Sequence, residues 1–136
     1  MTPQTQIAPG LDDIEALARR AWRRIPSALR SRAAEVVIQV TDFPDEETMQ
    51  EMELRSPFDI LGLYRGVSLD QRASGDLRGD VDMIFLYRRP ILDYWVESGE
   101  GLERLVRHVL IHEVGHHFGF SDADMAAIEA AADDAA

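Results

Sequence analysis

The chain contains no cysteine among its 136 residues. Disulfides, thiolate zinc clusters and cysteine nucleophiles are therefore excluded. Long apolar runs are also missing, since none approaches the roughly 18 residues that a membrane span requires. Residues 1–10 lack both the basic start and the apolar core of a signal peptide. We therefore expect a cytoplasmic protein without a membrane partner.

Positive charge is scarce, because 14 Lys and Arg residues face 25 Asp and Glu residues and the formal net charge is −11. Repulsion from phosphate groups then disfavours a nucleic acid as partner. The apolar content of 46% is ordinary for a globular protein, and the length fits one domain. We predict a flexible tail over residues 1–10 and a single domain over residues 11–136. The oligomeric state stays unknown.

The most informative segment that is present reads H-E-x-x-H-x-x-G-x-x-D. Residues four apart share one face of a helix, so His112 and His116 can bind one metal ion together. Glu113 lies about 100° further round, where it can reach a metal-bound water. Gly119 can take a positive φ, which lets Asp122 swing back as a third ligand. Three protein ligands with an open fourth position predict a catalytic zinc site.

Each residue of this segment also has a purely structural explanation. The two histidines can be satisfied core residues, Glu113 a solvated helix charge, and Gly119 an ordinary helix end. Asp122 can stabilise the start of the next helix, which is predicted to begin at Ser121 with Asp124 in a capping-box position. Because the whole spacing rarely arises by chance, we predict His112, His116 and Asp122 as zinc ligands and Glu113 as the catalytic base.

Two further histidines lie near the motif. His108 is one helical turn before His112, but three ligands along a straight helix span about 12 Å, too far for one ion with bonds near 2 Å. We therefore expect His108 to be partly exposed or to support a ligand. His117 points about 100° away from His116. For His117 we favour a packing role over a hydrogen bond near the site.

The predicted metal helix carries an apolar stripe that runs into the motif. Leu105 and Val109 share their direction on the helix with His112 and His116. The stripe therefore begins as core and ends as metal site, which would seat the ion at the edge of the hydrophobic interior.

Apolar spacing and breaker residues predict several helices and a few strands. We expect helices over residues 11–25, 27–34, 45–54, 91–98 and 101–118, and an Ala-rich helix from residue 121 to the C-terminus. We expect a buried strand over 35–40, a strand over 81–87, some strand within 58–67 and a loop over 70–80. Pro90 stops the strand over 81–87, which is typical of an edge strand. An exposed edge beside a zinc site can bind an extended peptide as one more strand.

Three segments together resemble the minimal zincin-like metallopeptidase family of small bacterial proteins. The likeness covers about residues 35–125. It includes the Leu-Gly-Leu-Tyr-Arg-Gly run at 61–66, the strand end at 84–91 and the His-Glu-x-x-His-His-Phe-Gly helix at 112–119. The resemblance implies a compact α+β fold, with a small mixed sheet packed on helices that include the metal-binding helix. It also implies zinc as the cofactor.

These patterns predict a zinc metalloendopeptidase, a hydrolase that acts on a peptide or protein substrate. Zinc polarises a water molecule, and Glu113 deprotonates it for attack on the peptide carbonyl. The oxyanion needs a further donor, for which Tyr64, Tyr87, Arg88 and His117 are candidates.

Two other functions remain open. One is a zinc-dependent endoribonuclease, because a family of small rRNA-maturation enzymes has the same ligand spacing with histidine in the third position. Asp122, Glu113 and the acidic charge favour peptide over RNA. The other is a non-catalytic or latent zinc-binding interaction protein, since larger zinc peptidases add a methionine-containing turn and Met125 comes too early for one. The intact Glu113 counts against it, because a structural zinc does not require a base.

Overall fold

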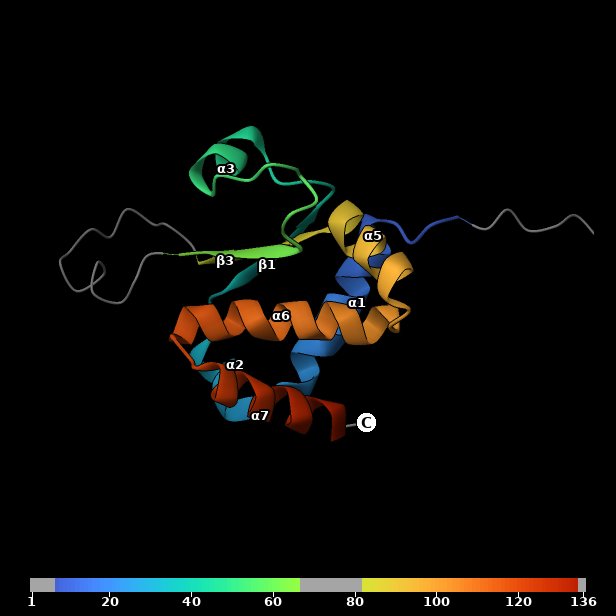
Figure 1. Cartoon of the computed structure of the whole chain (residues 1–136). Coiled ribbons are helices and arrows are strands. Elements are labelled where there is room, and N and C mark those ends of the chain that lie inside the picture. The colour runs from blue at the N-terminus through green and yellow to red at the C-terminus, as the bar shows by residue number, and fades with distance from the viewer. Residues whose placement is uncertain (1–6, 67–81, 135–136) are drawn as a thin grey trace, which may run out of the picture.

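The computed structural model describes residues 7–66 and 82–134. It is an α+β fold, as predicted, with a small mixed sheet and helices on both faces (Figure 1). The helices are α1 (Leu11–Arg24), α2 (Ser27–Arg32), α3 (Glu46–Glu51), α5 (Arg88–Ser98), α6 (Leu102–Phe118) and α7 (Asp122–Asp134). The strands are β1 (Val37–Thr41), β2 (Gly62–Arg65) and β3 (Met83–Tyr87). The predicted loop over 70–80 and most of the predicted tail lie outside the described residues.

The sheet has the strand order β1-β3-β2. β1 runs parallel to β3, and β2 runs antiparallel to it. β3 is therefore the central strand, and the prediction that residues 81–87 form an edge strand is wrong. Pro90 does not indicate an edge strand here, because it lies outside β3. The chain passes from β3 directly into α5, and Pro90 occupies the first turn of that helix. Amide groups in a first turn have no partner within the helix, so a proline is tolerated there.

β1 forms one edge of the sheet and is more exposed than the predicted buried strand. Val37 keeps 45% of its surface exposed, and Gln39, two residues on, is exposed as well, because side chains two apart lie on the same face of a strand. β2 forms the other edge and lies against α6. The strand next to the predicted metal helix is therefore β2, a short element drawn from the mixed segment 58–67.

The hydrophobic core lies between the sheet, α1 and α6. β3 contributes Ile84 and Leu86, both fully buried. Each buried aliphatic side chain of this size stabilises the fold by about 1.5–3 kcal/mol. The predicted stripe on α6 is confirmed in part, since Leu105 and Val109 are buried at its start. Among the described residues no helix is long and apolar enough to cross a bilayer.

The turn between α6 and α7 follows the predicted pattern. Gly119 ends α6 with a φ of 70°, and the N–H of Phe120 donates to the carbonyl of Gly115 at 2.9 Å. The N–H of Ser121 donates to the carboxylate of Asp124, and the N–H of Asp124 donates to the hydroxyl of Ser121, both at 3.2 Å. These reciprocal bonds start α7. The chain thereby reverses, and α7 runs back along α6 (Figure 1).

Several contacts hold α7 on α6, and two of them involve buried residues of α6. Gly115 leaves room for Met125, since a Cβ at Gly115 would lie only 2.7 Å from Cγ of Met125. Arg107 is buried, with 6% of its surface exposed, and it donates to the carboxylate of Asp133 at 2.7 Å. A buried guanidinium needs such a partner, so this ion pair holds the end of α7 in place.

Candidate active site

Glu113 projects from α6 toward the edge strand β2. The backbone N–H of Tyr64 donates to Oε1 of Glu113 at 2.8 Å. Gly62 permits this approach, because a Cβ there would lie 2.9 Å from Cγ1 of Val109 and 3.4 Å from Cγ of Glu113. The backbone of β2 thus holds the predicted catalytic carboxylate in one orientation.

The register of β2 explains why this amide can reach Glu113. The N–H of Tyr87 donates to the carbonyl of Leu61, and Gly62 is paired with Leu86. In an antiparallel ladder the bonded residues alternate, so the amide of Tyr64 points away from β3. The outer edge of β2 therefore faces Glu113. The edge expected beside the site exists, but β2 provides it rather than β3.

The environment of Glu113 favours proton uptake. Burial raises the pKa of its carboxyl group, while His116 and the N–H of Tyr64 oppose this shift. A carboxyl group with a raised pKa is a stronger base once it is ionised, and its pKa lies closer to neutral pH. This is the direction required of a general base.

Beside Glu113 lies a hydrogen-bonded group that we call the Tyr64–His117–Asp82 cluster. The hydroxyl of Tyr64 lies 2.8 Å from Nδ1 of His117 and 3.1 Å from Oδ1 of Asp82. Nδ1 of His117 is also 3.7 Å from Oδ2 of Asp82, whose side chain is 2% exposed. His117 packs edge-on against Tyr64 as well. The favoured packing role of His117 is therefore incomplete, because the ring is also hydrogen-bonded near the site.

The cluster reduces the list of candidate oxyanion donors. Tyr64 and His117 lie next to Glu113. Arg88 instead donates to the carbonyl of Pro9 at 2.6 Å and to Asp42 at 3.0 Å. Tyr87 lines a hollow of about 250 Å³ together with residues of β1, β2 and the α3 region. Tyr64 and His117 are therefore the better placed candidates.

The predicted metal ligands differ in burial. His112 is half-buried, whereas His116 and Asp122 are exposed. Burial lowers the pKa of His112, as does neighbouring His108, while Glu129 and Asp122 raise it. The lowered pKa favours the neutral imidazole, which is the form that binds a metal. The environment of His112 thus favours the form that binds a metal, and two carboxylates of α7, Glu129 and Asp122, oppose the lowering of its pKa.

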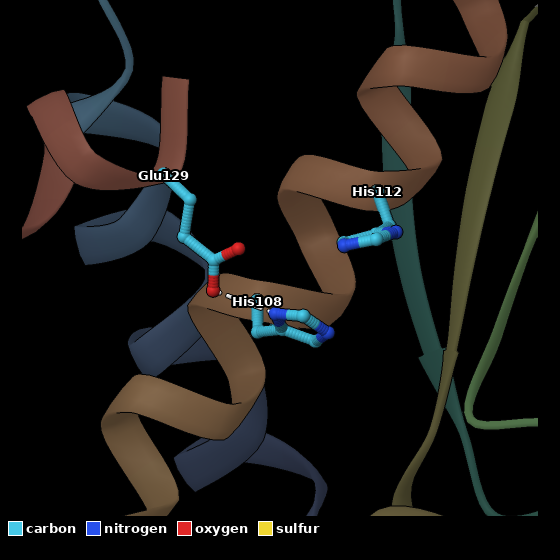
Figure 2. A group of neighbouring side chains, drawn as sticks. All are labelled: His108, His112 and Glu129. Atoms are coloured by element: carbon cyan, nitrogen blue, oxygen red, sulfur yellow. Dashed lines mark hydrogen bonds and ion pairs between the residues drawn. The ribbon is translucent and has the colours of Figure 1, made fainter. Parts of the chain in front are cut away.

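A different set of donors is the more compact one. Nδ1 of His108 lies 2.6 Å from Oε1 of Glu129, and the rings of His108 and His112 have their centroids 4.3 Å apart. Among the described residues, ligand atoms of His108, His112 and Glu129 all lie within 4.8 Å of one another (Figure 2). Two imidazoles and a carboxylate suit zinc. His116 and Asp122 are not part of this group, so their ligand roles stay predictions.

Two side chains of the site have no role in the sequence interpretation, namely Asp82 and Glu129. Asp82 reaches Tyr64 and His117 only through tertiary contacts, and no local pattern marks it. Glu129 stands in an Ala-rich helix, but its spacing offers a signal. It follows Asp122 by seven residues, which is about two helical turns. That spacing is close to the eight residues from His108 to His116 on α6, but the match has meaning only once the two helices are known to pack together.

Comparison with known families adds one finding. The family model for zincin-like metallopeptidases matches residues 33–132 of the chain. The match begins before β1, includes all of α6 and extends into α7. No curated protein matches the chain significantly.

Proposed function

Because the chain belongs to the zincin-like metallopeptidase family, we propose that it is a zinc-dependent peptidase with Glu113 as its general base. The observation that carries this proposal is the hydrogen bond from the amide of Tyr64 to Glu113. It joins the outer edge of a strand to the carboxylate of the HExxH helix. An extended substrate paired with this edge would place its scissile bond within reach of the base.

The outer edge of β2 supports a peptide as the substrate. An extended peptide can pair with this edge through backbone hydrogen bonds, independently of its side chains. The amide of Tyr64 would then exchange Glu113 for a substrate carbonyl, which leaves both carboxylate oxygens of Glu113 available.

We infer that His112, His116 and Asp122 hold the zinc ion. When bound, zinc supplies Lewis-acid chemistry, which polarises a carbonyl and makes water a better nucleophile. Glu113 accepts the proton of the attacking water and passes it to the leaving amine. Because the Tyr64 hydroxyl donates to Asp82, Nδ1 of His117 donates to that hydroxyl, and Nε2 could donate to the oxyanion only from a protonated imidazolium ring.

A non-catalytic zinc-binding protein is the second candidate. It is favoured by the compact His108–His112–Glu129 group, which leaves out His116 and Asp122. The proton-accepting environment of Glu113 weighs against it. An endoribonuclease has less support, because a net charge of −11 opposes binding to RNA.

Cleavage of a diverse peptide library by zinc-loaded protein tests the proposal. We expect cleavage by the wild type and a loss of about 10²-fold or more in Glu113→Gln, since general base catalysis contributes roughly that much. Both proteins should bind equal amounts of zinc. Glu97→Gln is the matched control, because Glu97 is an exposed carboxylate on α5. Full activity of Glu113→Gln would refute the mechanism, and zinc binding by an inactive wild type would favour the binding protein.

A further inference from the structure

The packing of α7 on α6 creates a repeat of possible metal ligands. α6 carries His108, His112 and His116 at intervals of four residues, which spans about 12 Å. α7 runs antiparallel to α6 (Figure 1) and carries Asp122 and Glu129, about 10.5 Å apart along its axis. The two spans are nearly equal, so each carboxylate can serve one pair of histidines. Two overlapping sets result, and His112 belongs to both.

The set formed by His108, His112 and Glu129 already has its ligand atoms close together. Glu129 reaches across from α7 to His108, and His112 lies one turn further along α6 (Figure 2). The side chain of His108 is 45% exposed and that of Glu129 is 23% exposed, so the pair is open to ions from solvent.

We propose that His108, Glu129 and His112 form a second divalent-cation site, which excludes occupation of the His112–His116–Asp122 site because both need the ring of His112. Tetrahedral zinc with bonds of about 2.0–2.1 Å places its ligand atoms roughly 3.4 Å apart. The three ligand atoms lie within 4.8 Å of one another, so modest side-chain rotations suffice. The ion takes the place of the His108–Glu129 hydrogen bond, and the proton of Nδ1 moves to Nε2 of the same neutral ring.

If His108 and Glu129 served only to hold α7 on α6, less of the observed geometry would be explained than by a metal site. The buried Arg107–Asp133 pair and the Gly115–Met125 contact already fix α7 on α6. A tie through His108 and Glu129 needs two side chains only. The ring of His112, 4.3 Å from that of His108, adds a third donor.

The second site has a consequence for the proposed peptidase, on which this step rests. The midpoints of the two histidine pairs are four residues apart, about 6 Å along α6. An ion in the second site is therefore displaced along α6 by about one helical turn from the His112–His116–Asp122 site, which lies next to Glu113. Zinc held there is bound without being available for the chemistry of Glu113. We expect the second site to be the weaker one, because the ion has to displace the His108–Glu129 hydrogen bond.

Zinc affinity of the full-length chain, measured by competition with a chromophoric chelator, tests the second site without an activity assay. The variant His116→Ala/Asp122→Asn should still bind one zinc ion per chain. Adding Glu129→Gln or His108→Gln should weaken this binding by about 100-fold or more, in line with loss of a ligand. Adding Glu97→Gln, the exposed control, should leave it unchanged. His112→Ala should remove high-affinity zinc from both sites.

Two results overturn the proposal. One is a folded His116→Ala/Asp122→Asn protein that binds no zinc, and the other is unchanged zinc binding after Glu129→Gln is added. Circular dichroism establishes that each variant is folded, and the single variant His116→Gln replaces the double one if that does not fold. Because these assays count zinc and not cleavage, an inactive wild type would reject the peptidase and leave the second site intact.

Discussion

The two sides of α6 are organised in different ways. On the side of β2, Glu113 accepts a backbone hydrogen bond from Tyr64 at 2.8 Å. On the side of α7, His108 and Glu129 bond to each other at 2.6 Å. A backbone donor fixes the orientation of its acceptor whether or not a metal is bound. A pair of potential metal ligands, in contrast, has to separate before it can bind an ion. The side that carries Glu113 is therefore preorganised, whereas the side that carries the candidate metal ligands offers alternative arrangements.

The largest effect is expected when the contact between β2 and α6 is broken. Gly62→Ala would place a Cβ 2.9 Å from the carbonyl oxygen of Phe85 and 2.9 Å from Val109. The backbone has to shift, which costs about 1–3 kcal/mol of unfolding free energy. Glu113 should lose the amide of Tyr64 and with it most cleavage, while zinc affinity stays unchanged. Chemical denaturation and peptide cleavage measure both effects.

Gly101→Ala is the matched control for this substitution, because a Cβ there meets nothing within 4 Å. If Gly62→Ala kept full activity and stability, the close approach of β2 would have no role in positioning Glu113.

A smaller effect is expected from Tyr64→Phe. This change removes the hydroxyl between His117 and Asp82 but keeps the backbone amide that holds Glu113. The nearly buried carboxylate of Asp82 loses a partner, which costs about 1–3 kcal/mol. If His117 serves the oxyanion, kcat should fall while KM and zinc affinity stay nearly constant. An unchanged kcat would separate the cluster from the chemistry.

On the α7 side, the contribution of the Arg107–Asp133 ion pair to stability should depend on pH. The hydrogen bond from Arg107 holds the pKa of the Asp133 carboxyl group below its ordinary value of 3.8. Its stabilisation is therefore fully present above pH 3.8 and is lost as the pH falls through the lower, folded-state pKa. Asp133→Asn should lower Tm at pH 7, and the difference from the wild type should shrink in acid. Thermal unfolding across pH measures this, with exposed Asp93→Asn as the control. A constant difference at every pH would contradict the role of the ion pair.

The smallest effect is expected from Gly115→Ala, within the HExxH segment. The new Cβ would crowd Met125, whose flexible side chain can move. The helix gains about 1 kcal/mol from replacing glycine, which offsets part of this cost. We expect a net change in unfolding free energy within about 1 kcal/mol, with weaker zinc binding because α7 shifts. Unaltered zinc affinity would mean that the position of α7 does not matter for the metal ligands.

The features that could be predicted from the sequence are those that depend on residues close together in the chain. Local patterns predicted α6, the turn at Gly119 and the Ser121–Asp124 box, because each depends on residues close in the chain. Strand order could not be predicted in this way. β2 comes from a glycine-containing segment, and its place beside β3 depends on tertiary pairing.

The same limit applies to the site. The motif alone predicts Glu113 as the base, but its hydrogen-bond partner Tyr64 is 49 residues away. Glu129 is 21 residues from His108, and the pair forms only after α7 folds back on α6. Side chains that support a site across such distances leave no periodic signal in one sequence.

Anomalous diffraction at the zinc edge, from crystals with one equivalent of zinc, tests most directly whether α6 holds an ion within reach of Glu113. We predict one peak bounded by His112, His116 and Asp122, with Glu113 beside it. A single peak at His108 and Glu129, with none near His116, would contradict the proposed peptidase. Zinc would then occupy the second site alone.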